Sequence, residues 1–243
     1  MPLPRFYIPQ PLNAPLRLAL PAAAAHHAAR VLRLRVGDAL IVFNGNGGEY
    51  AAHILAMGKQ DVTIEIERHD PIERESPLDV ILVQALSAAE RMDFSIQKAV
   101  ELGVRQIIPV QSERCVVRLH GERAAKRVQH WQQIAVSACE QGGRNRVPEI
   151  KPIISLAAWL ATSMPEWERW VLLPEAEKAL SEMPRPHKPL AVLVGPEGGF
   201  TDAEAAAAQQ AWHQSVRLGP RILRTETVAP TALAAMQVLW GDF

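Results

Sequence analysis

The sequence predicts an α/β protein with a mostly parallel sheet, preceded by a small module of closely spaced strands. Short strand patterns follow one another closely before residue 70, whereas strand and helix patterns alternate after residue 79. Between these regions, residues 69–78 (HDPIERESPL) combine two prolines with a cluster of charges, which is typical of a linker. The 243 residues therefore divide into two predicted domains, 1–72 and 73–243.

The composition is that of a folded protein without a strong charge bias. Hydrophobic residues make up 48% of the chain, and 26 basic residues balance 26 acidic ones. The zero net charge argues against a strongly basic coat for nucleic acid, but it does not exclude a local basic patch. Arginine greatly outnumbers lysine, which suits bidentate phosphate contacts. A genome that favours arginine codons explains this bias equally well.

The sequence offers no pattern for a metal site, a disulfide framework or a membrane anchor. Cys115 and Cys139 form no CxxC motif, and no HExxH or paired Cys/His spacing occurs. No apolar run reaches the length of a membrane span, and prolines interrupt the N-terminal segment where a signal peptide needs an apolar helix. We therefore expect a soluble, cytoplasmic protein with no metal and no membrane partner.

The N-terminal region is predicted to be a small β-barrel with one helix. Strands are expected at Arg5–Ile8, Ala39–Phe43, Glu49–Ala56 and Val62–Arg68. In the last of these strands, apolar and polar residues alternate cleanly, which is typical of a half-buried strand. A helix is expected at Ala22–Leu34, and the glycine-rich residues 44–48 should form a hairpin loop.

From Asp79 onwards, strands and helices alternate. Strands are expected at Val80–Leu86, Ile107–Val110, Val171–Leu173 and Leu190–Val194. Helices are expected at Met92–Leu102, Arg123–Gln141, Ser155–Leu160 and Ala176–Met183, with a final helix that reaches Trp240. The long helix carries Val128, Trp131, Ala135 and Ala138 on one stripe at helical spacing. This order of elements predicts a mostly parallel sheet covered by helices.

A glycine-rich loop follows the strand at Leu190–Val194. The loop reads Gly195-Pro196-Glu197-Gly198-Gly199, and Thr201 with Glu204 then forms a capping-box pattern that starts a helix. Glycines let the backbone approach a ligand closely, and a helix start offers free N–H groups. The loop matches neither GxGxxG nor GxxxxGK[ST]. It therefore predicts a ligand site of another kind, with a ligand-free turn or a nucleotide-phosphate site as alternatives.

A second motif near the C-terminus strengthens the prediction of a site. Residues 215–227 (SVRLGPRILRTET) place Gly-Pro after a strand pattern and a basic, hydroxyl-rich loop before the last helix. Together, LVGPEGGFTDAE and LGPRILRTET resemble the ribosomal-RNA uridine-N3 methyltransferases of the SPOUT class. Three further segments agree: SAAERMDFSIQKAVELGV at 87–104, QSERCVV at 111–117 and EQGGRNRVPEI at 140–150. The resemblance covers most of residues 80–240 and, more thinly, the N-terminal region.

The resemblance implies both a fold and an activity. The C-terminal domain would be a SPOUT α/β domain with a trefoil knot, which periodicity alone does not reveal, and the N-terminal domain a PUA-like RNA-binding β-barrel. The activity would be S-adenosyl-L-methionine-dependent methylation of N3 of the uridine at position 1498 of 16S rRNA. The partners would be 16S rRNA in the small ribosomal subunit and a second copy in a homodimer. A non-catalytic RNA-binding ribosome-assembly factor with the same fold is the alternative.

Given this resemblance, the two C-terminal motifs supply the candidate site residues. The expected donor-binding residues are Leu193, Val194, Gly195, Pro196, Glu197, Gly198, Gly199, Leu218, Gly219, Ile222, Leu223 and Thr225. A cation could stabilise the developing anion of the uracil ring, and a carboxylate could accept the N3 proton. The candidate cations are Arg114, Arg144 and Arg224 and the candidate bases Glu197 and Glu226, of which we place Arg224 and Glu226 nearest the chemistry. Core packing is the competing explanation for the leucines, and a turn or helix-start role is the competing explanation for the two glutamates.

Five arginines are the candidate RNA-binding residues. They are Arg5, Arg30, Arg33, Arg114 and Arg144, and each could contact phosphate. Solvated surface arginines are the simpler explanation from spacing alone. The pattern HHxxRVLR at 26–33 is similar to the N-terminal pattern of the same family, which favours the RNA interpretation.

Overall fold

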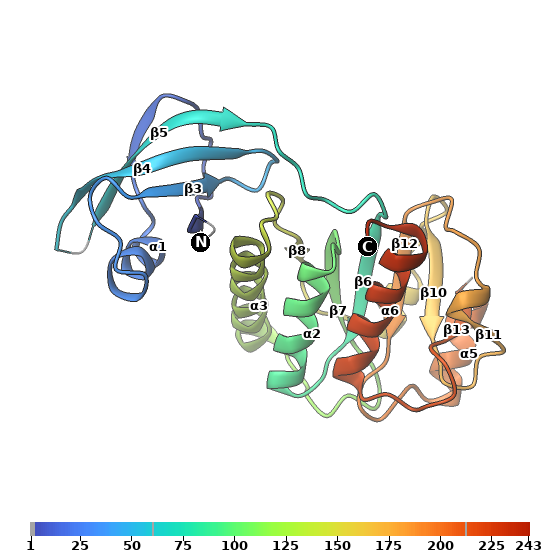
Figure 1. The fold of residues 1–243 in the computed structure, drawn as a ribbon. Helices are drawn as coiled ribbons and strands as arrows, with labels where there is room; N and C mark the ends of the chain where they lie inside the picture. The colour runs from blue at the N-terminus through green and yellow to red at the C-terminus, as the bar shows by residue number, and fades with distance from the viewer. Residues whose placement is uncertain (1–2, 60, 212) are drawn as a thin grey trace. The chain divides into compact units, whose positions relative to one another are not determined.

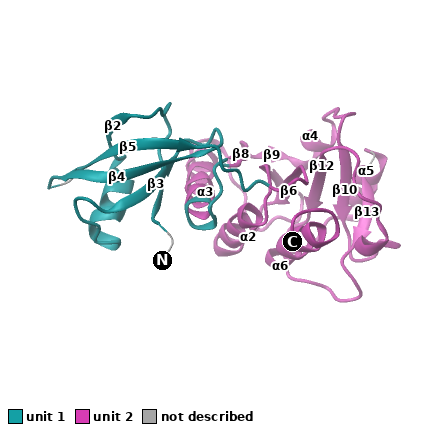
Figure 2. Ribbon diagram, turned by 45° about the horizontal axis from the view of Figure 1, so that its top comes forward, with its two compact units in different colours: residues 1–75, 139–147 teal, residues 76–138, 148–243 magenta. Residues whose placement is uncertain are grey.

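A computed structural model describes residues 3–59, 61–211 and 213–243, which form two compact units (Figure 2). Unit 1 consists of residues 1–75 and 139–147, and unit 2 of residues 76–138 and 148–243. The sequence placed the boundary after residue 72, inside the segment that joins the two units. The sequence did not associate residues 139–147 with the N-terminal region, because no local pattern distinguishes them from the rest of their helix and loop.

Unit 1 is built on a five-stranded sheet in the order β1-β3-β4-β5-β2 (Figure 1). Its strands are β1 (Arg5–Tyr7), β2 (Leu16–Ala19), β3 (Ala39–Phe43), β4 (Glu49–Met57) and β5 (Val62–Asp70). β1 pairs with β3 in parallel and the other pairs are antiparallel. Among the described residues the edge strands β1 and β2 do not pair with each other. The sequence missed β2, whose four residues are too short for a clear alternation.

A short helix and the buried faces of the strands form the core of unit 1. Helix α1 (Ala22–His26) continues as a π-helical turn, η1 (His27–Val31), and stops before the predicted end at Leu34. Ala25 and Ala28 pack from this helix into the core with Leu40, Ile54 and other apolar residues of the sheet. In β5 the predicted alternation is confirmed, because its apolar residues are buried and its polar residues are not.

Unit 2 contains an eight-stranded sheet in which every pair is parallel (Figure 1). The strand order is β11-β13-β10-β12-β6-β7-β8, with β9 also on β7. The strands are β6 (Val80–Ala85), β7 (Gln106–Gln111), β8 (Glu149–Ile150), β9 (Ile154–Ser155), β10 (Glu168–Leu172), β11 (Lys178–Ala179), β12 (Leu190–Val194) and β13 (Gln214–Arg217). The predicted mostly parallel sheet is therefore confirmed, and all residues of β6 and β12 are buried.

Five helices accompany this sheet. They are α2 (Ala89–Glu101), α3 (Gly121–Gly142), α4 (Leu156–Leu160), α5 (Asp202–Gln210) and α6 (Thr225–Trp240). Helix α3 reaches into unit 1 with its last residues. Trp131 of α3 is 1% exposed, and its indole donates a hydrogen bond to Asp93 of α2 over 3.1 Å. The predicted stripe on the long helix thus faces the core.

Two further local predictions were wrong. The expected helix at Ala176–Met183 is instead the short strand β11 followed by a 3-10 turn, Leu180–Glu182. Its residues pair with β13, and such long-range pairing outweighs a weak local helix preference. Helix α2 begins at Ala89, three residues before the predicted start at Met92. Pro230 lies at the sixth position of α6, beyond the first turn, where proline is best tolerated.

The end of the chain returns across the sheet. Strand β13 lies beyond β10, whereas the helix that follows it, α6, packs on α2 and on β12, on the other side of β10. The connection through residues 218–224 must therefore pass the end of β10. A return of this kind is required by the predicted trefoil knot.

Neither a membrane helix nor a metal cluster occurs in the ranges that the structure describes. No helix there is long and apolar enough to cross a bilayer. No group of three or more His, Cys, Asp or Glu side chains in those ranges could hold a metal ion. Both cysteines are free and buried, and burial raises the pKa of the Cys139 thiol to about 12.

A buried ion-pair network ties the strands of unit 1 to its C-terminal segments. Glu49 on β4 has a side chain that is 7% exposed, and it accepts hydrogen bonds from Arg5 over 2.5 Å and from Arg74 over 2.8 Å. Arg5 also donates to the side chain of Asn145 over 2.5 Å. Burial alone would raise the pKa of Glu49, but the two arginines outweigh this effect and lower it below the usual 4.5.

We predict that Glu49→Gln destabilises unit 1 by about 3 kcal/mol, because the substitution leaves the buried Arg5 without its ionic partner. The contribution of Glu49 is fully present above pH 4.5, and it is lost as the pH falls through the lower pKa of the folded state. Hydrogen exchange of β4 amides as a function of denaturant measures the effect within unit 1.

Glu65→Gln is the matched control, because Glu65 pairs at the surface with Arg17, whose side chain is 66% exposed. That pair should contribute less than about 1 kcal/mol. Equal losses in the two variants would contradict the role given to the buried network.

Candidate functional site at the glycine-rich loop

The predicted glycine-rich loop follows the carboxyl end of the central strand β12. Gly199 has a φ of +67°, which favours glycine, and its N–H donates to the carbonyl of Pro196 over 3.0 Å. Helix α5 then starts with the predicted capping box: Thr201 accepts from the Glu204 N–H over 3.2 Å, and Glu204 accepts from the Thr201 N–H over 3.0 Å. The local sequence therefore determines both the turn and the helix start.

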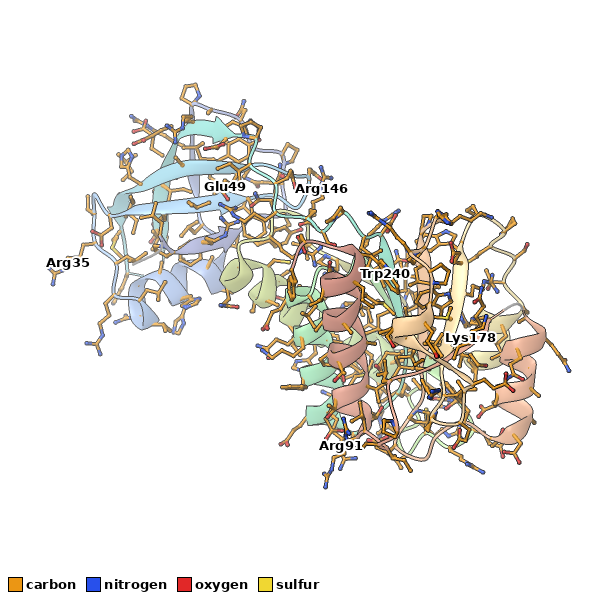
Figure 3. The ribbon with its side chains drawn as sticks, turned by 45° about the vertical axis from the view of Figure 1, so that its right-hand side comes forward. Arg35, Glu49, Arg91, Arg146, Lys178 and Trp240 are labelled. Carbon is orange, nitrogen blue, oxygen red and sulfur yellow. The ribbon has the colours of Figure 1, made fainter. Side chains whose placement is uncertain are left out.

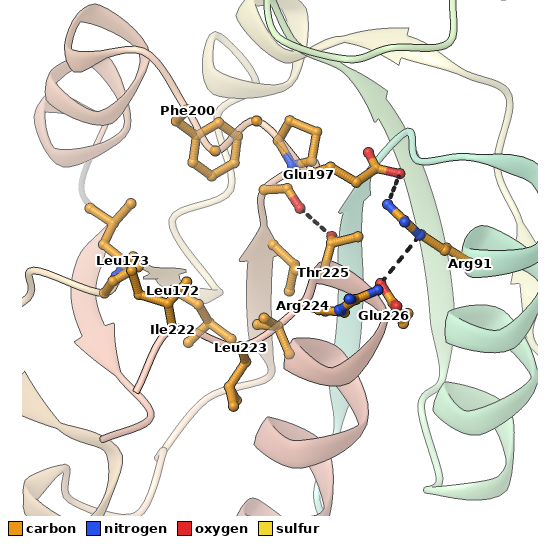
Figure 4. Close-up of a pocket in the computed structure, with 17 residues that line it drawn as sticks. Arg91, Leu172, Leu173, Glu197, Phe200, Ile222, Leu223, Arg224, Thr225 and Glu226 are labelled. Carbon is orange, nitrogen blue, oxygen red and sulfur yellow. Dashed lines mark hydrogen bonds and ion pairs between the residues drawn. The ribbon is translucent and has the colours of Figure 1, made fainter. Parts of the chain in front are cut away.

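The loop forms one side of a cavity of about 570 Å³ (Figure 4). The other sides come from the end of β10, the start of α2 and the segment that leads into α6. The cavity is lined by Arg91, Leu172, Leu173, Pro174, Val194, Gly195, Pro196, Glu197, Gly198, Gly199, Phe200, Ile222, Leu223, Arg224, Thr225, Glu226 and Val228. A cavity at the carboxyl ends of parallel strands is the usual place for a ligand in an open α/β sheet.

The two sides of the cavity differ in chemistry. Leu172, Leu173, Ile222 and Leu223 form an apolar side, whereas the charged side chains lie on the opposite side (Figure 4). Ile222 is 86% exposed, so this apolar side continues to the protein surface. A ligand with one flat apolar part and one charged part would match this arrangement.

Three neighbouring elements hold the loop in place. Thr225, the first residue of α6, donates its hydroxyl hydrogen to the carbonyl of Gly195 over 2.7 Å. Arg114 donates to the carbonyls of Gly198 and Phe200 over 3.3 and 3.2 Å. At the start of α2, the Ala88 N–H donates to Glu197 over 2.8 Å. The loop is therefore a preorganised element rather than a free turn.

The structure adds one charged residue that the sequence did not single out. Arg91, in the first turn of α2, lies 3.3 Å from Glu197 and 3.7 Å from Glu226, measured from nitrogen to oxygen (Figure 4). The predicted helix began at Met92, so Arg91 fell outside it. A positive charge at a helix N-terminus opposes the helix dipole. The position of Arg91 near the start of a helix was therefore the feature of the sequence that could have marked it as a site residue.

Most of the predicted donor-binding and catalytic residues meet in this cavity. Those that line it are Val194, Gly195, Pro196, Glu197, Gly198, Gly199, Ile222, Leu223, Arg224, Thr225 and Glu226. Leu193 is 1% exposed and belongs to the core of the sheet. Leu218 and Gly219 line an adjoining cavity of about 60 Å³ that shares Leu223 and other apolar residues with the larger one.

The sequence also missed the contribution of β10. Leu172, Leu173 and Pro174 complete the apolar side, although the sequence predicted a strand at Val171–Leu173. The signal was the position of this strand end, because the carboxyl ends of parallel strands share one edge of the sheet.

The predicted RNA-binding arginines fall into three environments. Arg30 and Arg33 are exposed, as is the nearby Arg35, which extends from unit 1 in Figure 3. Arg5 and Arg144 are instead inside unit 1, where Arg5 pairs with Glu49 and Arg144 with Glu75. Arg114 lies beside the glycine-rich loop of unit 2. No single surface therefore contains all five residues.

Fold and site together define a two-unit α/β protein with a ligand cavity at the carboxyl edge of its parallel sheet. The family model described as RNA methyltransferase domain matches residues 74–237, and that described as RNA methyltransferase PUA domain matches residues 20–67. The chain belongs to this family of RNA methyltransferases.

Named relatives extend over almost the whole chain. The ribosomal RNA small subunit methyltransferase E of Buchnera aphidicola is 35% identical over 240 residues, which cover 99% of this chain and 98% of the relative. A crystal structure of the Neisseria gonorrhoeae enzyme of the same name, bound to S-adenosyl methionine, has 43% identity, a TM-score of 0.93 and 99% coverage of both chains. A Legionella pneumophila protein in complex with the bound cofactor SAM has 37% identity and a TM-score of 0.96 over the full length of both chains.

We predict that Thr225→Val loosens the glycine-rich loop, because valine keeps the shape of threonine but leaves the Gly195 carbonyl without its donor. Loss of one such hydrogen bond costs about 1 kcal/mol, so amides of residues 195–200 should exchange roughly 5-fold faster. Thr227→Val is the matched control, because Thr227 is an exposed residue of the same helix turn. Equal exchange in wild type and Thr225→Val would show that this bond does not hold the loop.

Proposed function

We propose that this protein transfers the methyl group of S-adenosyl-L-methionine to N3 of a uridine in the 16S rRNA of the small ribosomal subunit. The observation that carries the proposal is that the glycine-rich loop and the start of α6 line the same cavity. Family membership supports RNA methylation as the reaction. The names of the relatives support small-subunit rRNA as the substrate, and the bound S-adenosyl methionine of the Neisseria gonorrhoeae structure supports the donor.

The residues of the cavity fit this donor. Its volume of about 570 Å³ lies within the range of small-molecule sites. The apolar side suits an adenine ring, and the backbone groups of the glycine-rich loop suit the polar methionine part, which leaves the charged side for the target base. At Gly195, an added Cβ would lie 3.2 Å from the ring of Phe200, so a side chain there would intrude on the cavity wall. The bound donor would supply an electrophilic methyl group.

The chain itself would bind, orient and move one proton. Uracil N3–H is a weak acid, so methylation needs a proton acceptor and stabilisation of the ring charge. Glu226 takes the proton as the N3–H bond breaks, and Arg224 stabilises the negative charge that spreads onto the ring oxygens. The new N3–CH3 bond forms as the S–CH3 bond breaks, which leaves S-adenosylhomocysteine.

Unit 1 would contribute to RNA binding through its exposed arginines. Arg30 and Arg33 are free to approach phosphates, and Arg33 adopts a φ of +55° that directs the chain after η1. Arg5 and Arg144 would act indirectly, by holding the unit together through their ion pairs. A substrate in the small ribosomal subunit supports the expectation that the protein acts in the cytoplasm.

The proposed function predicts how the protein binds the methyl donor. Calorimetry should detect micromolar-scale binding of S-adenosylmethionine by the wild type and none by Gly195→Trp, because the indole would fill the cavity. Gly142→Trp is the control, since an added Cβ there meets no atom within 4 Å. Circular dichroism checks that both variants fold.

The same proteins are then tested on small ribosomal subunits that lack the modification. Mass spectrometry of the digested RNA should find 3-methyluridine with the wild type and with Gly142→Trp only. If the folded wild type binds RNA but does not bind the donor and forms no 3-methyluridine, the alternative of a non-catalytic assembly factor is favoured.

We also infer that two copies pair through α6. Val238, Leu239 and Phe243 are 67%, 45% and 67% exposed, although they are large and apolar. Val238 and Leu239 line an apolar cavity of about 410 Å³ that includes Ala235 and Leu180. Contiguous exposed apolar surface of this kind is typical of an interface, and a symmetric dimer would cover both copies at once. Trp131 and Trp240 are less available, because Trp131 is buried and Trp240 packs on Trp170.

We predict that Val238→Glu converts a dimer into a monomer, because a carboxylate would be buried at the proposed interface. Light scattering after size-exclusion chromatography measures the mass. Ala206→Glu, on an exposed face of α5, should leave the mass unchanged. A wild-type mass of about 27 kDa, that of one chain of 26.8 kDa, would reject the dimer.

A further inference from the structure

Arg91 occupies a position that helix stability does not explain. It lies in the first turn of α2, where a positive charge opposes the helix dipole. Its side chain is 40% exposed and lines the cavity. Its place is set instead by two carboxylates from elements far away in the sequence, Glu197 of the glycine-rich loop and Glu226 of α6.

The two carboxylates have different surroundings. Glu197 accepts hydrogen bonds from the Ala88 N–H over 2.8 Å and from Arg91 over 3.3 Å, so it anchors the start of α2. Glu226 is 22% exposed on its side chain, and no group among the described residues donates a hydrogen bond to it. Glu197 therefore orients Arg91 through its Oε1, while its Oε2 is buried without a hydrogen-bond partner among the described residues. Glu226 accepts no such hydrogen bond at all and keeps its acceptor capacity for a ligand.

The charged side of the cavity also has unused donors. A guanidinium carries five N–H groups, and the described residues use only one hydrogen bond from Arg91, the bond to Glu197. Arg224, the N-cap residue of α6, is exposed, and no carboxylate in the described ranges lies within ion-pairing distance of it. Two arginines with free donors thus line the same cavity as Glu226, to which no described group donates a hydrogen bond.

This set of groups matches the atoms around N3 of uracil. N3–H is a donor flanked by two carbonyl oxygens, O2 and O4, which accept hydrogen bonds and carry the charge when N3 loses its proton. Cytosine differs from uracil at C4, where it has an amino donor instead of a carbonyl oxygen, and at N3, which carries no hydrogen. A site with two donors and one acceptor would accept the first base and reject the second.

We propose that Arg91 is a specificity-determining residue that donates a hydrogen bond to a ring oxygen of the target uracil. Arg224 serves the other ring oxygen, and Glu226 takes the N3 proton. Glu197 holds Arg91 in place by the ion pair described above. The negative charge of the ring then rests on two oxygens that both face guanidinium groups, and N3 is left open to the methyl group. This inference rests on the proposed function, since it concerns the recognition of the same base.

The experiment compares wild type with Arg91→Met and Arg91→Lys on reconstituted small subunits. The target nucleotide is uridine, 4-thiouridine or 2-thiouridine, because sulfur is a weak hydrogen-bond acceptor. With uridine, Arg91→Met should lower kcat roughly 100-fold, as expected for loss of one donor to a developing oxyanion. Arg91→Lys should recover part of this loss, because an ammonium group also donates.

The thio substitutions separate a direct contact from a structural role. One of the two thiouridines should lower kcat of the wild type relative to uridine. In Arg91→Met, the decrease caused by the same thiouridine should be smaller by at least about 5-fold. A merely structural arginine would leave both sulfur effects unchanged in the variant. Arg105→Met is the matched control, because Arg105 is ion-paired to Asp79 over 2.6 Å and does not line the cavity.

Each outcome bears on the inference. Donor binding by Arg91→Met should stay within about 2-fold of the wild type, whereas its loss would assign Arg91 to the donor and overturn the inference. If Arg91→Met fails to fold by circular dichroism, Arg91→Leu, which also lacks a donor, gives the same comparison of sulfur effects. Sulfur effects that are equal in wild type and variant overturn the inference but leave the proposed function intact. A wild type that binds the donor but forms no 3-methyluridine overturns both.

Discussion

The site depends on one hydrogen bond between two segments that lie thirty residues apart in the chain. Thr225 at the start of α6 donates to the carbonyl of Gly195 at the end of β12. This bond joins the glycine-rich loop to the segment that returns across the sheet, and the cavity lies between them. The ring of Phe200 lies so close to Gly195 that an added Cβ would come within 3.2 Å of it, so this position of the loop has no space for a side chain. The ligand site is therefore a consequence of how the end of the chain packs.

Electrostatics add a second constraint on the same place. The charged side brings together Arg91, Glu197, Arg224 and Glu226 from three elements. Opposite charges on neighbouring elements hold α2, the loop and α6 in register, and they also leave donors and acceptors free. Unpaired donors and acceptors destabilise a closed core, but they suit a site in which the ligand completes the hydrogen bonds. Stability and recognition thus use the same side chains.

In unit 1, different arginines serve the stability of the fold and the proposed binding of RNA. Arg5 and Arg144 are paired with buried or half-buried carboxylates and stabilise the unit. Arg30 and Arg33 are exposed on the helix and the turn that follows it. Charge alone does not distinguish the two groups, because both consist of arginines. Burial and the presence of a carboxylate partner distinguish them.

The sequence by itself determined the fold class, the capping box at Thr201, the limits of β12 and the two motifs that line the cavity. These features depend on local patterns of apolar, glycine and capping residues. Only the tertiary structure decided that Arg91 and the end of β10 belong to the site, and that residues 139–147 belong to unit 1. It also replaced the predicted helix at Ala176–Met183 with β11, which exists through pairing with β13. Contacts between distant segments have no local pattern, because the partner of each residue depends on the path of the whole chain.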